Sequence, residues 1–332
     1  MRGWRAILTG AVIGGTLAGC GSGLHSTSGA ASPATTSGAG ATNRPSGSAQ
    51  RSGSAPAAGG SAGSAVVYLQ SSAPVPFTGD VVKLTVQEAA GAGAPRWIRV
   101  ASATVRLGDG HTASASEPCT GTSLPSPEAG LVVQHAYQQT GAVTAQVTAL
   151  TTCGKQGQPD LTGAAATMRV LPSAPAASAS WPRCGTSQIQ VTATGTGAGL
   201  GHIGVLFTLR NASSMNCRLY GYPGLLLLDA RGQALPTTVV RAASGAYLFA
   251  AVVPHWVALQ PGAVGSFDLQ YGDNPVGAQA SQPYATACPT ASQVEVTLPD
   301  AFDHAVVPAD MAPCGGQVLV SPVVPGSQWL EP

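Results

Sequence analysis

Few residues in this sequence have the types and spacing that catalysis requires. The six histidines are scattered, and none stands in a known catalytic motif. A hydrolytic site needs a nucleophile, a base and an orienting group within reach of one another, yet no G-x-S-x-G, H-E-x-x-H or P-loop pattern occurs in the parts expected to fold. Asp300 and Asp303 could do acid–base chemistry in principle, but they lie in an expected loop, where a solvated turn is the simpler interpretation. We therefore predict no catalytic residues, no cofactor and no enzymatic activity.

The cysteines indicate cross-links rather than a metal site. Beyond Cys20 the chain has an even number of them, and no pair has C-x-x-C spacing: Cys119, Cys153, Cys184, Cys217, Cys288 and Cys314. A zinc site would favour Cys or His ligands two to four residues apart. We predict three disulfides, each within one domain, and no metal.

The pairing of the cysteines follows from the expected domains. Cys119 and Cys153 are alone in the first folded segment and must pair if the segments fold separately. In the second, strands near 187–194 and 203–210 would form a hairpin centred near residue 198, which places Cys184 close to Cys217. The remaining two cysteines then pair, although the other two connectivities of these four stay open.

A glycine-rich run at Gly195–Gly201 resembles a phosphate-binding loop only superficially. His202 stands where the third glycine of G-x-G-x-x-G should be, and no helix is expected to follow. We predict a hairpin loop here.

The N-terminus has the plan of an export signal. Arg2 and Arg5 precede a short apolar run, Ala6–Ala18, that is too short to span a bilayer. The run ends in Leu17-Ala18-Gly19-Cys20, which resembles the lipobox of bacterial lipoproteins. The resemblance implies a signal peptide at residues 1–19 and a thioether lipid with further acyl chains, such as palmitate, on Cys20. An ordinary signal peptide with a chance cysteine is the alternative.

The composition excludes a nucleic-acid partner and defines a tether. Charged residues make up only 9% of the chain and the net charge is +1, so the basic surface of a nucleic-acid binder is missing. After Cys20, residues 21–64 contain no aromatic residue and only two charges, Arg44 and Arg51. Such a stretch cannot bury enough apolar surface to fold, and we predict a lipidated cysteine and a disordered tether over residues 20–64.

Residues 65–172 are predicted to form the first β-sandwich. Apolar and polar residues alternate over Val82–Gln87 and again over Val143–Ala149, a pattern typical of half-buried strands. Leu107–His111, His135–Tyr137 and Thr140–Val147 resemble the PKD type of Ig-like domain, which pairs a G-D-G turn with a later H-x-Y strand. The resemblance implies a spacer or adhesive module.

A linker at residues 173–183 leads to a second predicted β-sandwich at 184–324, followed by a tail at 325–332. The expected strands are Ile189–Thr192, Val205–Leu209, Leu225–Leu228, Tyr247–Val253, Val264–Tyr271, Val294–Leu298 and Val318–Val320. This segment resembles an actinobacterial exported family known as domain-of-unknown-function family 4232. The residues that carry the resemblance are Phe207–Asn211, Cys217–Gly224, Val257–Gly262, Cys314 and Val318–Val320. It implies an Ig-like fold with disulfides and an envelope location, but no activity.

Trp256 is the predicted binding residue. Alternation places Val257 and Leu259 inward and Trp256 outward. The next strand has the same polarity, with Phe267, Leu269 and Tyr271 on one face and Ser266, Asp268 and Gln270 on the other. Trp is enriched at interaction hot spots and stacks on sugars. The alternatives are that a loop such as Gly272–Ala287, or the first domain, covers the ring, or that the strand starts one residue later.

The sequence as a whole predicts an all-β protein: two Ig-like sandwiches in tandem after a disordered lipoprotein tether. We expect a non-enzymatic binding or spacing module, anchored by lipid at the outer face of the cytoplasmic membrane and extending into the cell wall. Its partners would be the membrane and either a cell-wall glycan or another envelope protein. The alternative is a cell-wall hydrolase, or another enzyme, with an unrecognised active site.

Overall fold

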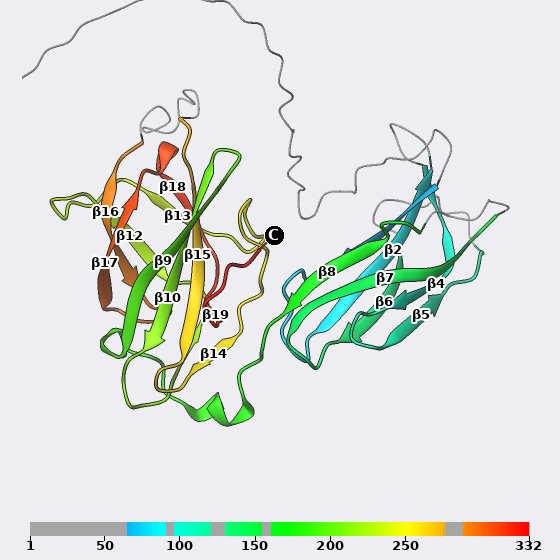
Figure 1. The fold of residues 1–332 in the computed structure, drawn as a ribbon, viewed down its shortest axis with the longest axis horizontal. Helices are drawn as coiled ribbons and strands as arrows, with labels where there is room; N and C mark the ends of the chain where they lie inside the picture. The colour runs from blue at the N-terminus through cyan, green and yellow to red at the C-terminus, as the bar shows by residue number, and fades with distance from the viewer. Residues whose placement is uncertain (1–64, 91–95, 121–129, 155–160, 276–287, 332) are drawn as a thin grey trace, which may run out of the picture. The chain divides into compact units, whose positions relative to one another are not determined.

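The computed structural model describes residues 65–90, 96–120, 130–154, 161–275 and 288–331. They form two β bodies (Figure 1), which confirms the predicted all-β fold. In these residues the only helical elements are short 3₁₀ segments, at Ala176–Ser180, Thr186–Gln188 and Cys314–Gly316. No helix in the described part of the chain is long and apolar enough to cross a membrane. Cys20 and the predicted tether lie outside the described residues.

The first body consists of two four-stranded antiparallel sheets. In one sheet the central strand β2 (Val81–Ala90) pairs with three others: β1 (Ala65–Ser71), β3 (Arg96–Ile98) and β6 (Leu131–Ala136). The other sheet has the order β5 (Thr112–Ser116), β4 (Val100–Arg106), β7 (Gly141–Thr152) and β8 (Ala165–Val170). The disulfide Cys119–Cys153 joins the segment that follows β5 to the end of β7.

The alternation seen in the sequence defines the core of the first body. Val82, Leu84 and Val86 on β2 are fully buried and pack against Val105 and Val147 of the other sheet. Apolar side chains at every second position bury one face of each sheet, because successive residues of a strand point to opposite sides.

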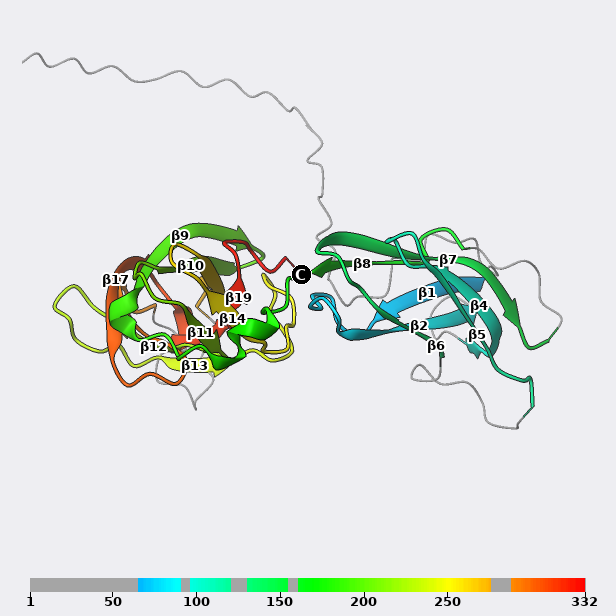
Figure 2. The same cartoon turned by 90° about the horizontal axis from the view of Figure 1, so that it is seen from below.

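The second body has a large sheet and two smaller ones. The large sheet has the order β13 (Thr238–Arg241), β18 (Gln317–Val320), β15 (Val264–Gly272), β10 (His202–Asn211) and β9 (Ile189–Gly199), and β19 (Val324–Pro325) also pairs with β15. The smaller sheets are β12 (Gly224–Leu228), β16 (Ala291–Thr297) and β17 (His304–Met311), and the pair β11 (Cys217–Tyr220) with β14 (Trp256–Leu259). Figure 2 shows the β9–β10 hairpin on one side of this body and β12 on the other.

The glycine-rich run is strand rather than the predicted loop. β9 continues to Gly199, and the hairpin turns at Leu200-Gly201, where both residues have positive φ. A bulge at Leu206/Phe207 shifts the register. The Trp329 indole lies against this hairpin. A Cβ on Gly195 would be 3.7 Å from Trp329, an ordinary contact, whereas one on Gly204 of β10 would be only 3.1 Å from it and would crowd the ring.

The outward face of β15 is buried, contrary to the polarity expected from its sequence. Ser266, Asp268 and Gln270 are at most 3% exposed. Asp268 Oδ2 accepts a hydrogen bond of 2.8 Å from the backbone N–H of Leu330, and the backbone N–H of Leu248 donates to Gln270 Oε1. Residues 326–330, expected to be part of a tail, therefore pack on the sheet.

Tyr247–Val253, predicted as a strand, has no regular structure. Its backbone does not pair with a neighbouring strand. Instead, the N–H of Ala250 donates a hydrogen bond to the carbonyl of Leu330 in the C-terminal segment. Phe249 and Val252 are nonetheless buried, so the apolar residues that suggested a strand do reach the core.

Candidate functional site

Trp256 is the first residue of β14, so the strand does not start one residue later, which was one of the alternatives. β14 pairs antiparallel with β11, and Trp256 lies opposite Tyr220. Val257 and Leu259 are 1% exposed and anchor the strand in the core. Trp256 and Ala258 remain half-buried on the other face.

Three side chains gather around the Trp256 indole. The guanidinium carbon of Arg218 lies 4.0 Å from the ring centroid, and that of Arg183 lies 5.5 Å from it. The Tyr220 ring is tilted by 42° at a centroid distance of 5.0 Å. We call these four residues the Trp256 surface. Each cation–π contact of this kind contributes about 0.5–1 kcal/mol at an exposed site.

A disulfide holds the two arginines in place. Arg183 precedes Cys184 and Arg218 follows Cys217, and these cysteines are bonded to each other. The backbone N–H of Arg218 donates to the carbonyl of Pro182 at 3.0 Å, and that of Cys184 donates to the carbonyl of Arg218 at 3.2 Å. The cross-link therefore brings both guanidinium groups to one edge of β11, beside Trp256.

The Trp256 surface carries one unbalanced positive charge. Arg183 forms an ion pair with Asp300, and both side chains are about half exposed. Arg218 forms no ion pair with a described residue, and its Nε, although buried, has no hydrogen-bond partner among them. A planar guanidinium stacked on an indole, with N–H groups left to donate, suits a carboxylate or a phosphate.

Trp256 is less exposed than the sequence predicted. The ring is half-buried because the two arginines and Tyr220 contact it. Most of the loop considered as a cover, residues 276–287, lies outside the described part. Sequence reasoning missed Arg183 and Arg218, although their position next to two cysteines expected to pair was a usable signal.

The other candidate residues are placed as follows. The disulfides join the pairs that the sequence favoured: Cys119–Cys153, Cys184–Cys217 and Cys288–Cys314. Asp303 is exposed and accepts a hydrogen bond of 2.9 Å from Thr186 Oγ1. Among the described residues, one group of carboxylate and imidazole side chains is close enough to hold a metal ion: Asp109, His111 and His135.

These features define a disulfide-bonded β protein of the kind found outside the reducing cytoplasm. Residues 184–325 match a family model described as "Domain of unknown function (DUF4232)". No curated protein matches the chain.

Among solved structures, the chain is similar to the adhesin InvE of Yersinia pseudotuberculosis, at 14% identity and a TM-score of 0.18. The match covers 62% of this chain and 55% of the adhesin chain, so this chain spans only about half the length of that protein.

Proposed function

We propose that this chain is a non-enzymatic lipoprotein of the cell envelope that binds an acidic glycan through the Trp256 surface. The observation that carries the proposal is the guanidinium of Arg218, which lies over the Trp256 ring and forms no ion pair with any described residue. Arg218 covers part of the indole, and the part that stays exposed can pack on the C–H face of a sugar, while the guanidinium binds a carboxylate or phosphate substituent of the same polymer. The first body, which we infer to be of the PKD type, would act as a spacer between membrane and ligand.

The glycan is favoured over a protein partner because of the size and charge of the site. Protein interfaces bury about 800 Å² on each partner around an apolar centre. The Trp256 surface instead consists of two aromatic rings and two cations, one of which is neutralised by Asp300. Sugar stacking and a charge-assisted hydrogen bond need no larger surface than this.

Trp256→Ala and Arg218→Ala are each expected to weaken retention on isolated cell walls about tenfold or more, which corresponds to about 1.4 kcal/mol. Binding is measured by co-sedimentation at several salt concentrations, because a charge-assisted contact weakens with salt. Trp97→Ala serves as the matched control, since Trp97 of the first body is also half-buried beside a tyrosine, at a centroid distance of 5.9 Å.

Unchanged retention of both variants would remove the Trp256 surface from the proposal. Retention that survives removal of wall protein, but is lost after the acidic substituents are hydrolysed, supports the glycan. Retention lost with the protein fraction would instead make the partner another envelope protein and would overturn the glycan assignment.

The lipid anchor has its own test. Cys20→Ala should abolish incorporation of an alkyne-bearing palmitate analogue and shift the protein from the membrane to the soluble fraction, because two or more acyl chains are needed for stable anchoring. Ser22→Ala, in the same segment but with Cys20 intact, should keep both properties. A Cys20→Ala protein that still takes up the label would place the lipid on another residue.

A further inference from the structure

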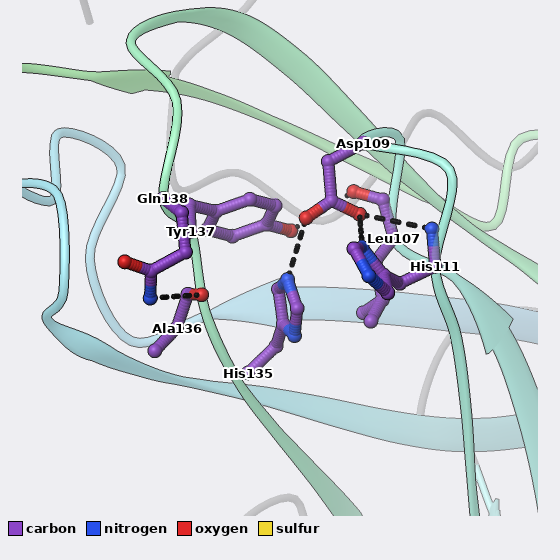
Figure 3. Close-up of polar contacts among 7 residues, drawn as sticks. All are labelled: Leu107, Asp109, His111, His135, Ala136, Tyr137 and Gln138. Carbon is purple, nitrogen blue, oxygen red and sulfur yellow. Dashed lines mark hydrogen bonds and ion pairs between the residues drawn. The ribbon is translucent and has the colours of Figure 1, made fainter.

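The first body contains a cluster of one carboxylate and two imidazoles that the proposed function does not use (Figure 3). Asp109 lies in the turn between β4 and β5, His111 follows two residues later, and His135 comes from β6. The Nε2 of His135 is 2.6 Å from Asp109 Oδ2, and the Nδ1 of His111 is 3.2 Å from Asp109 Oδ1. The candidate ligand atoms all lie within 4.8 Å of one another.

The turn that presents Asp109 is fixed by its backbone. The N–H of Leu107 donates to the carbonyl of His111 at 2.9 Å, and the N–H of His111 donates to Asp109 Oδ1 at 3.1 Å. Gly108 has a φ of +87°, and a Cβ there would lie 2.6 Å from the carbonyl oxygen of Thr144. The carboxylate is thus held in one place before any ligand arrives.

Tyr137 ties this turn to the strand that carries His135. Its hydroxyl donates to the carbonyl of Leu107 at 3.0 Å, and the side chain is 1% exposed. The His135 ring stands edge-on to the Tyr137 ring, at 88° and a centroid distance of 4.7 Å. Tyr137 therefore holds Asp109 and His135, which are 26 residues apart in the sequence, next to each other.

The charge of the cluster suits a cation. Burial raises the pKa of Asp109, but hydrogen bonds from His135 and His111 together with the charge of His135 outweigh it, so that the pKa lies below its usual value. The carboxylate is therefore ionised at neutral pH. The His111 side chain is 71% exposed, which leaves one side of the cluster open to water.

We propose that Asp109, His111 and His135 bind one Zn²⁺ ion, with water as the fourth ligand. Two imidazole nitrogens and a carboxylate oxygen are a ligand set that zinc uses, at about 2.0–2.2 Å. Tetrahedral ligands at that distance are about 3.3 Å apart, so the exposed His111 ring needs only a small rotation. The ion takes the place of the proton between Asp109 and His135, and the His135 proton moves to Nδ1.

The alternative role for this cluster is purely structural, with the Asp109–His135 hydrogen bond holding the turn. Measuring whether the purified chain binds Zn²⁺ distinguishes the two roles, because a purely structural hydrogen bond requires no metal. Equilibrium dialysis of the purified chain against ZnCl₂ should give one ion per chain with a micromolar or lower Kd. Zn²⁺ should also raise the melting temperature of the first body, because a ligand that binds only the folded state stabilises it.

Asp109→Asn and His135→Ala are each expected to weaken Zn²⁺ binding at least tenfold and to abolish the metal-induced rise in melting temperature. His304→Ala is the matched control, since His304 Nε2 lies 3.6 Å from a carboxylate oxygen of Glu295 in the second body, and it should leave the affinity unchanged. Asp109→Asn keeps a side-chain oxygen for the turn, so that loss of metal binding in this variant is not a folding defect.

Three results would overturn the proposal: no Zn²⁺ bound by the native chain, a stoichiometry that survives in both variants, or Ca²⁺ binding in preference to Zn²⁺.

Discussion

Asp268→Asn is expected to stabilise the second body at pH 7 and above and to flatten its pH dependence between about pH 4 and pH 7. Asp268 on β15 has no exposed surface, and its Oδ2 accepts a hydrogen bond from the backbone N–H of Leu330. The other oxygen, Oδ1, has no hydrogen bond within the described residues. Burial raises the pKa of Asp268 to about 7, against a partial lowering by the Leu330 hydrogen bond.

The direction follows from proton linkage. The pKa of an unfolded Asp is about 3.9, so between pH 4 and pH 7 the folded state holds a proton that the unfolded state has lost. Stability is therefore greatest at the acidic end of this range and falls as the pH rises through the folded pKa. A difference of about three units sets an upper limit of roughly 4 kcal/mol on the loss. Asparagine cannot ionise and keeps an oxygen for Leu330.

Urea unfolding at pH 4.5, 6.0 and 7.5 measures the effect. The native chain should lose stability across the series, whereas Asp268→Asn should lose much less. Asp310→Asn removes an exposed carboxylate on β17 and should behave like the native chain. If the native and Asp268→Asn proteins show the same slope, the buried carboxylate is not what makes stability depend on pH.

Removing residues 327–332 is expected to destabilise the second body by about 2–5 kcal/mol, the usual cost of losing a large buried apolar side chain. Leu330 is 1% exposed, and Trp329 lies over Gly195 and Gly204. The deletion also uncovers the outward face of β15. Once water reaches Asp268, its pKa should return toward that of an exposed carboxyl, and the fall in stability between pH 4 and pH 7 should disappear.

A shorter deletion controls for the effect of the chain end. Removing only Glu331 and Pro332 leaves Leu330 and its N–H in place, and both stability and pH dependence should stay as in the native chain. Calorimetry and urea unfolding of the two truncated proteins provide the comparison. Equal melting temperatures would show that the C-terminal segment does not stabilise the sheet.

The sequence predicted correctly those features that depend on residues close together in the chain, such as which face of a strand is apolar. Alternation placed Phe267 and Leu269 in the core, and both are fully buried. It could not show that Asp268, on the opposite face, is also buried, because the cover comes from Leu330, 62 residues away. Strand periodicity carries no information about a segment that crosses the sheet without pairing with it.

The candidate sites show the same limit. Trp256 was found because its strand is regular and its neighbours Val257 and Leu259 are apolar. The two arginines on its ring come from separate segments that meet at the Cys184–Cys217 disulfide. His135 is likewise 26 residues from Asp109, so a search for closely spaced ligands in the sequence did not find the cluster.

The disulfide of the first body has a mechanical consequence. A pulling force applied between Ala65 and Leu171 would run through the Cys119–Cys153 bond and bypass the chain between the two cysteines, which are 34 positions apart. At about 3.3 Å per residue, the bypassed stretch removes on the order of 110 Å from the maximum extension. Under load this body can therefore open only in part, and the length it yields depends on whether the bond is oxidised or reduced.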